Sequence, residues 1–212
     1  MKIVVGARSS PLSRAQVAEV FQEIIAHHPS LEFFPHWTSS PGDRDRITSL
    51  RLLGQTDFFT KDLDELLLRG DIRIAIHSAK DLPQPLLDEL AIVAMTKGVD
   101  PRDSLVFSSK GFKKGGIVGV SSVRREEELK KIDPTLRFVD LRGTIEERLS
   151  LLKRGEVDGV VIAEAALIRL QLTDLPRKLL DAPTPLLQGR LAILAKGEDE
   201  EMQKIFSSIH YA

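Results

Sequence analysis

The chain has 212 residues, 42% of them hydrophobic and 29% charged, which is enough for one large domain or two small ones with a true core. Its 30 basic and 31 acidic residues leave a net charge of −1, so no global field attracts nucleic acid or an acidic membrane, and any anion site must be local. The absence of cysteine excludes disulfides, thiolate metal sites and thiol nucleophiles. The chain shows neither the apolar region of a signal peptide nor an apolar run of about 18 residues, and we therefore expect a cytoplasmic protein.

The first hundred residues alternate between strand and helix patterns. Ser10 is a plausible N-cap, and Pro11 suits the first position of the helix that follows. Gly70 is typical of a left-handed cap at the end of the second helix. Ser39–Arg46 is polar, contains Pro41–Gly42 and predicts a mobile loop. The predicted strands cover 2–7, 31–38, 72–77 and 90–95, and the predicted helices cover 11–27 and 58–69.

The second half of the chain repeats this alternation. Thr144-Ile-Glu-Glu147 has the pattern of a capping box and predicts the start of a helix. Segments near 97–101 and 183–189 look like crossings between two domains. The predicted strands cover 117–120, 136–141, 157–163 and 191–195, and the predicted helices cover 123–133, 144–155 and about 198–209.

Two weak internal similarities bear on the domain organisation. Residues 66–72 resemble 151–157, and residues 4–10 resemble 117–122. One explanation is that the order helix, glycine, strand recurs in any α/β protein. The other is a pair of similarly wound α/β domains that present strand ends to a shared cleft. The second explanation predicts one domain from 1–97 with 190–212, another from 98–189, and two hinge strands.

The stretch Ile72–Pro83 begins as a strand and ends as a polar segment closed by proline. His77, Ser78, Lys80 and Asp81 therefore gather at the carboxyl end of a strand, where open α/β sheets bind their ligands. The alternative is an ordinary exit from a strand, with a solvated Lys-Asp pair.

Several arginines lie at predicted turns between a strand and a helix. The amino end of a helix favours anions, and a guanidinium grips a carboxylate or phosphate with two hydrogen bonds. Any one of these arginines could simply be a solvated helix end. Together they predict a ligand with several carboxylates or phosphates. They are Arg8, Arg124, Arg125 and Arg142, with Arg148 one turn further into its helix.

Other kinds of site have little support. The five histidines show no metal-ligand spacing, and the chain contains no nucleophile elbow, P-loop or G-x-G-x-x-G motif. Basic residues interleaved with aromatics, as in nucleic-acid-binding proteins, are also missing.

The segment His77–Pro83 resembles the active-site segment of the porphobilinogen deaminase (hydroxymethylbilane synthase) family. Further motifs of that family occur in family order along nearly the whole chain, and the ordered set is far more specific than any single motif. These motifs are Ala7–Leu12, Asp100–Asp103, Gly119–Arg125, Leu141–Gly143 with Arg148, and Gln188–Gly189.

The resemblance implies a transferase of heme biosynthesis. The family joins four porphobilinogen units head to tail, with loss of ammonia, into a linear tetrapyrrole. It also implies an α/β fold with two domains of the type II periplasmic-binding-protein kind, built on mixed sheets around a cleft. The expected partners are porphobilinogen and linear oligopyrroles, not nucleic acid or membrane, and a monomer is expected.

The resemblance also implies roles for individual residues. Asp81 matches the catalytic aspartate, whose carboxylate would stabilise positive charge on a pyrrole nitrogen. Phe59 matches an aromatic near the growing end of the product, although a core position in the 58–69 helix would also explain it. The implied carboxylate binders are Arg8, Arg124, Arg125, Arg142, Arg148 and Arg169. Further implied binding residues are Ser10, Gln16, Ser78, Lys80, Ser121, Ser122, Gly143 and Gln188.

The sequence departs from the family in three respects. The usual third domain is expected to be absent, and so is the cysteine that normally holds a dipyrromethane primer through a thioether. In addition, Leu53–Asp57 stands where the family usually has a Gly-Gly-Lys-Gly type run, and Thr56 replaces its lysine. One hypothesis is a minimal deaminase that holds its dipyrromethane non-covalently. The alternatives are a non-catalytic cytoplasmic binding module for a polycarboxylate and an inactive relative.

Overall fold

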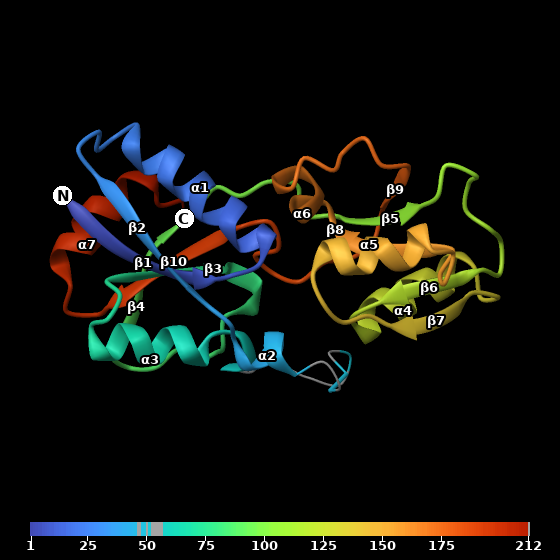
Figure 1. Ribbon diagram of the computed structural model, residues 1–212, viewed down its shortest axis with the longest axis horizontal. Helices are drawn as coiled ribbons and strands as arrows, with labels where there is room; N and C mark the ends of the chain where they lie inside the picture. Colours follow the sequence, from blue (N-terminus) through green and yellow to red (C-terminus); the bar gives the residue numbers. More distant parts are fainter. Residues whose placement is uncertain (46–47, 50, 52–56, 212) are drawn as a thin grey trace. The chain divides into compact units, whose positions relative to one another are not determined.

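The computed structural model describes residues 1–45, 48–49, 51 and 57–211 (Figure 1). The chain divides into two compact units. Unit 1 comprises Met1–Arg44, Gln55–Val99 and Leu186–Ala212, and unit 2 comprises Asp45–Gly54 and Asp100–Pro185. The chain passes between the units at 99–100 and at 185–186, within the segments 97–101 and 183–189 that were predicted as crossings. The boundaries 1–97, 98–189 and 190–212, as limits of separate domains, stay a prediction.

Unit 1 is built on a five-stranded mixed sheet in the order β2-β1-β3-β10-β4. Strand β1 is parallel to both β2 and β3, whereas β10 is antiparallel to β3 and β4. Strand β10, between β3 and β4, thus comes from the C-terminal part of the chain. The strands are β1 (Lys2–Arg8), β2 (Glu32–Thr38), β3 (Ile74–Ser78), β4 (Leu90–Met95) and β10 (Leu191–Lys196).

Helices cover both faces of this sheet. One face packs against α1 and α7, and the other packs against α3 through Leu63, Leu66 and Leu67. Successive side chains of a buried strand point to opposite faces, so β1 and β3 read as nearly continuous apolar runs. The helical segments are α1 (Pro11–Ile25), α2 (Pro41–Arg44), η1 (Asp57–Phe59), α3 (Lys61–Arg69), η2 (Ala79–Asp81), α7 (Glu200–Phe206) and η3 (Ser207–Ile209).

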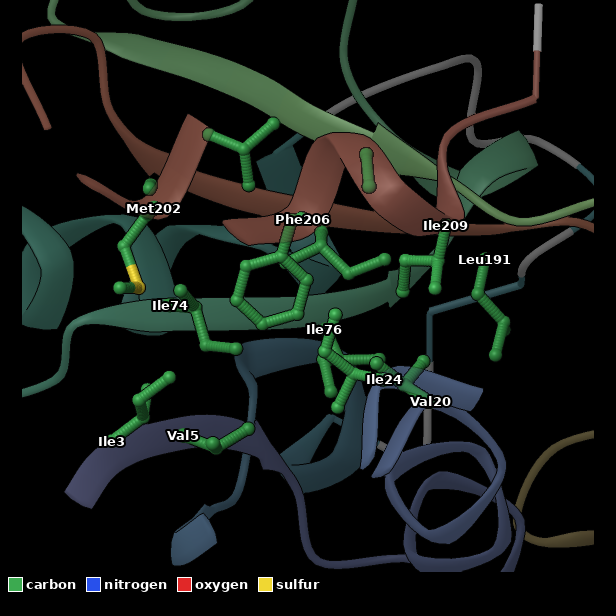
Figure 2. Packing of buried hydrophobic residues seen from close by; sticks show 14 of the residues in the cluster. Ile3, Val5, Val20, Ile24, Ile74, Ile76, Leu191, Met202, Phe206 and Ile209 are labelled. Carbon is green, nitrogen blue, oxygen red and sulfur yellow. The ribbon is translucent and has the colours of Figure 1, made fainter. Parts of the chain in front are cut away.

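The larger core of unit 1 lies between the sheet and the pair α1 and α7. Figure 2 shows the ring of Phe206 among the aliphatic side chains of Ile74, Ile76 and Met202. Phe206 and Met202 are fully buried although they come from the C-terminal helix. Burial of each such side chain contributes about 1.5–3 kcal/mol, so this helix is an integral part of unit 1.

Unit 2 repeats the same plan. Its mixed sheet has the order β7-β6-β8-β5-β9, with β6 parallel to β7 and β8 and with β5 antiparallel to β8 and β9. The strands are β5 (Asp103–Phe107), β6 (Ile117–Val120), β7 (Arg137–Asp140), β8 (Gly159–Ala163) and β9 (Arg177–Leu180). The helices are α4 (Val123–Ile132), α5 (Ile145–Lys153) and α6 (Glu164–Arg169).

The internal similarities of the sequence mark equivalent positions of the two units. Residues 4–10 cover most of β1, and residues 117–122 cover β6. Each is the strand with a parallel neighbour on both sides in its sheet. Residues 66–72 and 151–157 end a helix at Gly70 (φ 79°) and Gly155 (φ 75°), two left-handed positions that suit glycine. The prediction of two similarly wound α/β halves with mixed sheets is confirmed.

Several local predictions need correction. Pro41–Arg44 forms a short helix where a loop was expected, because proline suits the first helical turn and the Arg44 N–H donates to the Ser40 carbonyl at 3.1 Å. The helix predicted over 58–69 is a 3₁₀ turn followed by α3. Strands β5 and β9 and helix α6 were not predicted. The departure at Leu53–Asp57, including Thr56, lies outside the described residues except for the backbone of Asp57.

Candidate functional site

The carboxyl end of β3 places Lys80 and Asp81 in the turn η2. The turn is held at both ends, because the Ala79 N–H donates to the Arg190 carbonyl at 3.0 Å and the Leu82 side chain is buried. Asp81 itself is half-buried. Among the described parts of the chain, its carboxylate has no hydrogen-bond or ion-pair partner. A fixed turn thus presents a carboxylate that can accept from a ligand.

Lys80 reaches from this turn to the segment before β10. Its Nζ donates to Oε1 of Gln188 at 3.1 Å, and Gln188 is buried. The neighbouring Leu187 has a φ of 63°, in the left-handed region that non-glycine residues seldom adopt. The hydrogen bond joins residues 108 positions apart in the sequence and fixes where the lysine charge lies.

Helix α1 contributes two polar contacts at the same edge of the sheet. Gln16 is buried, and its Nε2 donates to Oγ of Ser78 at 2.9 Å. Ser10 caps the helix, since its Oγ accepts from the Ser13 N–H at 3.2 Å and donates to the Ser13 hydroxyl at 3.0 Å. The predicted N-cap is therefore confirmed, and the hydroxyl of Ser10 is already engaged in local contacts.

Arg8 ends β1, the strand next to β3. Its guanidinium lies 4.6 Å from the centroid of the Phe59 ring, and the Phe58 ring packs edge-on against that ring. Phe59 is half-buried and belongs to the 3₁₀ turn η1, so it does not continue the buried face of α3. The aromatic ring supports the guanidinium through a cation–π contact.

His77 lies in β3 directly before Ser78, and its imidazole is buried. Burial lowers the pKa of His77 from 6.5 to about 4, and the positive charge of Arg8 acts in the same direction. Its Nε2 atom is buried with no hydrogen-bond partner among the described residues. His77 is thus a neutral group beside the charged end of β1.

In unit 2 the adjacent arginines at the start of α4 meet a buried carboxylate. Arg125 Nη2 lies 2.6 Å from Oδ1 of Asp103, and Arg124 Nη2 lies 2.5 Å from Oδ2. Burial raises the pKa of Asp103, but the Arg125 and Arg124 guanidiniums outweigh it and hold the pKa well below its usual range. Both arginines are therefore partly neutralised from within the unit. Their role as ligand contacts stays a prediction.

The two serines that follow β6, Ser121 and Ser122, make different hydrogen bonds. Ser122 caps α4, because its Oγ accepts from the Arg125 N–H at 3.3 Å. Ser121 is half-buried, and its Oγ faces Nη1 of Arg125 at 3.2 Å and Nη1 of Arg148 at 3.5 Å. The hydroxyl of Ser121 thus meets the side chains of two of the predicted arginines.

The segment after β7 holds Gly143 in a conformation that only glycine adopts easily. Its φ is 85°, and a Cβ there would lie 2.2 Å from Oε2 of Glu147. That carboxylate accepts from the Thr144 N–H at 2.7 Å and completes the predicted capping box of α5. Arg148 Nε donates to the Gly143 carbonyl at 3.0 Å. The glycine thus permits both the cap and the placement of Arg148.

Two further predicted arginines lie elsewhere in unit 2, on the segment after β7 and on α6. Arg142 donates to the backbone carbonyl of Asp45. Arg169 is the last residue of α6, more than a turn beyond the carboxyl end of β8. Both stay predicted ligand contacts.

Two residues with clear contacts had no individual role in the sequence-based interpretation. They are Asp103 and Glu164, whose carboxylate accepts from Arg177 at 2.8 Å and from the Ser104 hydroxyl. Asp103 belongs to the motif Asp100–Asp103 and could have been noticed as an acidic residue in a chain with an arginine pair. Nothing in the sequence signals the pairing of Glu164.

None of the described helices is long and apolar enough to cross a membrane. Within the described residues, no three His, Asp or Glu side chains are grouped so that they could hold a metal ion.

Solved structures of other proteins share this fold. CbnR, a LysR family transcriptional regulator, is 11% identical with a TM-score of 0.61, and the match covers 99% of this chain and 70% of that one. A periplasmic substrate-binding protein of an ABC transporter from Coxiella burnetii is 15% identical with a TM-score of 0.58, over 99% of this chain and 92% of that one. Both units thus have the type II periplasmic-binding-protein-like fold, and that prediction is confirmed.

Sequence comparison identifies the family. The family model for "Porphobilinogen deaminase, dipyromethane cofactor binding domain" matches residues 3–204. A probable porphobilinogen deaminase of Chlamydia pneumoniae is 38% identical over 97% of this chain and 89% of its own length. Porphobilinogen deaminase of Streptococcus sanguinis is 34% identical over 99% of this chain and 72% of its own length. The chain therefore belongs to the porphobilinogen deaminase family.

Proposed function

We propose that the chain is a hydroxymethylbilane synthase that joins porphobilinogen units head to tail. The observation that carries this proposal is the Asp81 carboxylate, which has no partner among the described residues and stands at the carboxyl end of β3. Lys80 in the same turn and Arg8 on the neighbouring strand supply positive charge at the same edge of the sheet. A carboxylate at the same edge of the sheet as two cationic side chains suits a substrate that becomes cationic at its ring while its side chains stay anionic.

The chemistry assigns Asp81 a definite task. The C–N bond of the aminomethyl arm of porphobilinogen breaks, ammonia leaves, and positive charge develops on the pyrrole nitrogen. A C–C bond then forms with the free α-carbon of the preceding ring, which loses its proton. Asp81 would accept a hydrogen bond from the ring N–H and stabilise the charge in the transition state. It could also take up the released proton.

The arginines and polar residues would bind the acetate and propionate groups of the pyrrole rings. In unit 1 these contacts come from Arg8, Lys80, Ser78, Gln16 and Gln188. In unit 2 they come from Arg148, Ser121, Arg124, Arg142 and Arg169. A guanidinium binds a carboxylate with two parallel hydrogen bonds, so it orients the ring as well as neutralising it.

The residues present fit a dipyrromethane by their charge but not by covalent attachment. The cations suit its carboxylates, whereas the 212 residues contain no thiol that could form a thioether. When bound, a dipyrromethane supplies the free α-carbon to which the first porphobilinogen is joined. Arg8 and Lys80 of unit 1 would hold it through its carboxylates, so binding would be reversible.

Turnover by the purified chain tests the proposed function. We expect ammonia release and formation of a linear tetrapyrrole when the protein is incubated with porphobilinogen and a synthetic dipyrromethane. Four ammonia molecules should appear for each tetrapyrrole formed, because each porphobilinogen unit loses one ammonia. Binding of porphobilinogen without ammonia release would instead indicate a binding protein and would contradict the proposal.

Intact mass spectrometry tests how the dipyrromethane is held. We expect an adduct of dipyrromethane mass under native conditions that disappears after denaturation in acid, because no covalent bond retains it. A family member that carries a cysteine is a suitable control for a covalent adduct, once that adduct has been verified by the same measurement. An adduct of this chain that survives denaturation would contradict non-covalent binding.

A further inference from the structure

Asp103, the first residue of β5, joins the two arginines at the start of α4. Its side chain is only 1% exposed. Oδ1 accepts from Arg125 Nη2 at 2.6 Å, and Oδ2 accepts from Arg125 Nε at 3.2 Å and from Arg124 Nη2 at 2.5 Å. One buried carboxylate therefore fixes two guanidiniums, one of them through a fork of two parallel hydrogen bonds.

The three charged groups differ in how far they reach solvent. The Arg125 side chain is 8% exposed and also donates to the Val161 carbonyl at 3.3 Å, so most of its N–H groups are engaged inside the unit. The Arg124 side chain is 27% exposed, and its Nη1 donates to the Pro183 carbonyl at 2.6 Å. Arg125 thus makes its contacts inside unit 2, whereas Arg124 is the arginine of the pair that a ligand can reach.

Because Arg125 is held in place, its hydrogen bond to Ser121 also orients the Ser121 hydroxyl. Nη1 of Arg125 donates to the Ser121 Oγ at 3.2 Å, and Nη1 of Arg148 approaches the same oxygen at 3.5 Å. A hydroxyl oxygen has two acceptor positions and one hydrogen. With guanidinium donors on the oxygen, the hydrogen must point to a different group, and an anionic oxygen is the acceptor that neighbouring arginines favour.

We propose that Asp103 is a positioning residue for carboxylate binding by unit 2. It holds Arg124 and Arg125 in place and, through Arg125, sets the Ser121 hydroxyl to donate to a carboxylate of the ligand. This inference rests on the proposed function, because the ligand is taken to be porphobilinogen or an oligopyrrole. Its consequence is that a negative charge of the protein strengthens the binding of an anion.

Two simpler explanations predict different results. If Asp103 only neutralised the arginines, its removal would raise the positive potential and tighten anion binding. If Asp103 only stabilised the fold, any comparable buried carboxylate would be equivalent to it. Glu164 is such a carboxylate, since it is buried in the same unit and paired with Arg177 and Ser104.

The experiment compares Asp103→Asn, Asp103→Glu and the matched control Glu164→Gln with the wild type, by KM and kcat for porphobilinogen. We expect Asp103→Asn to raise KM about tenfold, as loss of charge-assisted contacts does, with kcat within about twofold, because the reacting ring is assigned to Asp81. Asp103→Glu keeps the charge and should recover part of the lost affinity. Glu164→Gln should leave KM within about twofold of the wild-type value. If Asp103→Asn does not fold, the same comparison is made with Asp103→Glu, which should then raise KM by a smaller factor.

An unchanged or lowered KM in the Asp103 variants would overturn the inference, and so would an equal rise of KM in Glu164→Gln. A second measurement separates this outcome from failure of the proposed function. The Nε–H signal of Arg125 in proton–nitrogen NMR spectra should be protected from exchange in the wild type and in Glu164→Gln, and should lose protection in Asp103→Asn. Wild-type protein without turnover contradicts the proposed function, whereas an Arg125 signal unaffected by Asp103→Asn contradicts the positioning role.

Discussion

Replacing Asp81 with asparagine is expected to lower kcat for porphobilinogen by about 100- to 1,000-fold, the usual loss when one preorganised electrostatic contact to a transition state is removed. Asparagine keeps the shape of the side chain but not its charge. The amide cannot balance positive charge on a pyrrole nitrogen, and it is a poor proton acceptor. Steady-state ammonia release measures the effect.

The same substitution should leave the fold unchanged. Asp81 is half-buried and makes no ion pair with any described residue, so its replacement breaks no contact within that part of the protein. Asp88→Asn is the matched control, because Asp88 is an exposed aspartate of the same unit. Thermal unfolding of both variants should match that of the wild type. Turnover of Asp81→Asn within about twofold of the control would remove Asp81 from the catalytic role.

Acid is expected to destabilise the protein through His77. The pKa of this imidazole is lowered to about 4 by burial and by Arg8, whereas in the unfolded chain it is near 6.5. As the pH falls below 6.5, the unfolded state gains a proton that the folded state does not bind until about pH 4. The free energy of unfolding should therefore decrease over this window by about 3 kcal/mol from this group alone. Above pH 6.5 this contribution is fully present.

A variant without the titrating group isolates the effect. His77→Gln should show a flatter dependence of unfolding free energy on pH between about 4 and 6.5 than the wild type, whatever its stability at neutral pH. Urea unfolding at a series of pH values provides the measurement. His36→Gln is the matched control, because it removes an exposed histidine of the same unit. Parallel curves for His77→Gln and the wild type would show that His77 does not set the acid sensitivity.

Most of the elements around the proposed site could be predicted from local patterns. Ser10 with Pro11 marks the start of α1, Gly70 ends α3, and the capping box at Thr144 begins α5, because each of these signals acts within one helical turn. The elements that were missed are α2, β5, β9 and α6, which have four to six residues each. So few residues give a weak hydrophobic period, which was recognised at the equally short β6 and β7 but not at these four segments.

The individual contacts of the candidate site were much less predictable than its location. The sequence indicated that Arg124 and Arg125 lie at a helix start, but not that Asp103 would face both of them. These partners are about twenty positions apart in the sequence and lie on different elements, a strand and a helix. Likewise, the pairing of Lys80 with Gln188 depends on β10 lying next to β3, which no local pattern encodes.

The sequence by itself determined the α/β class, the family and the location of Asp81 at the end of a strand, and it offered two similar halves as one of two explanations of its internal similarities. These follow from periodicity, turn chemistry and an ordered set of motifs, all of which are properties of the chain read in order. Only the tertiary structure decided which charges are compensated internally and which can face a ligand. Asp103 buries its carboxylate against Arg125, whereas Asp81 has no such partner among the described residues. The physical reason is that the charge state and hydrogen bonding of a side chain depend on burial and on neighbours from distant segments, which meet only when the sheets form.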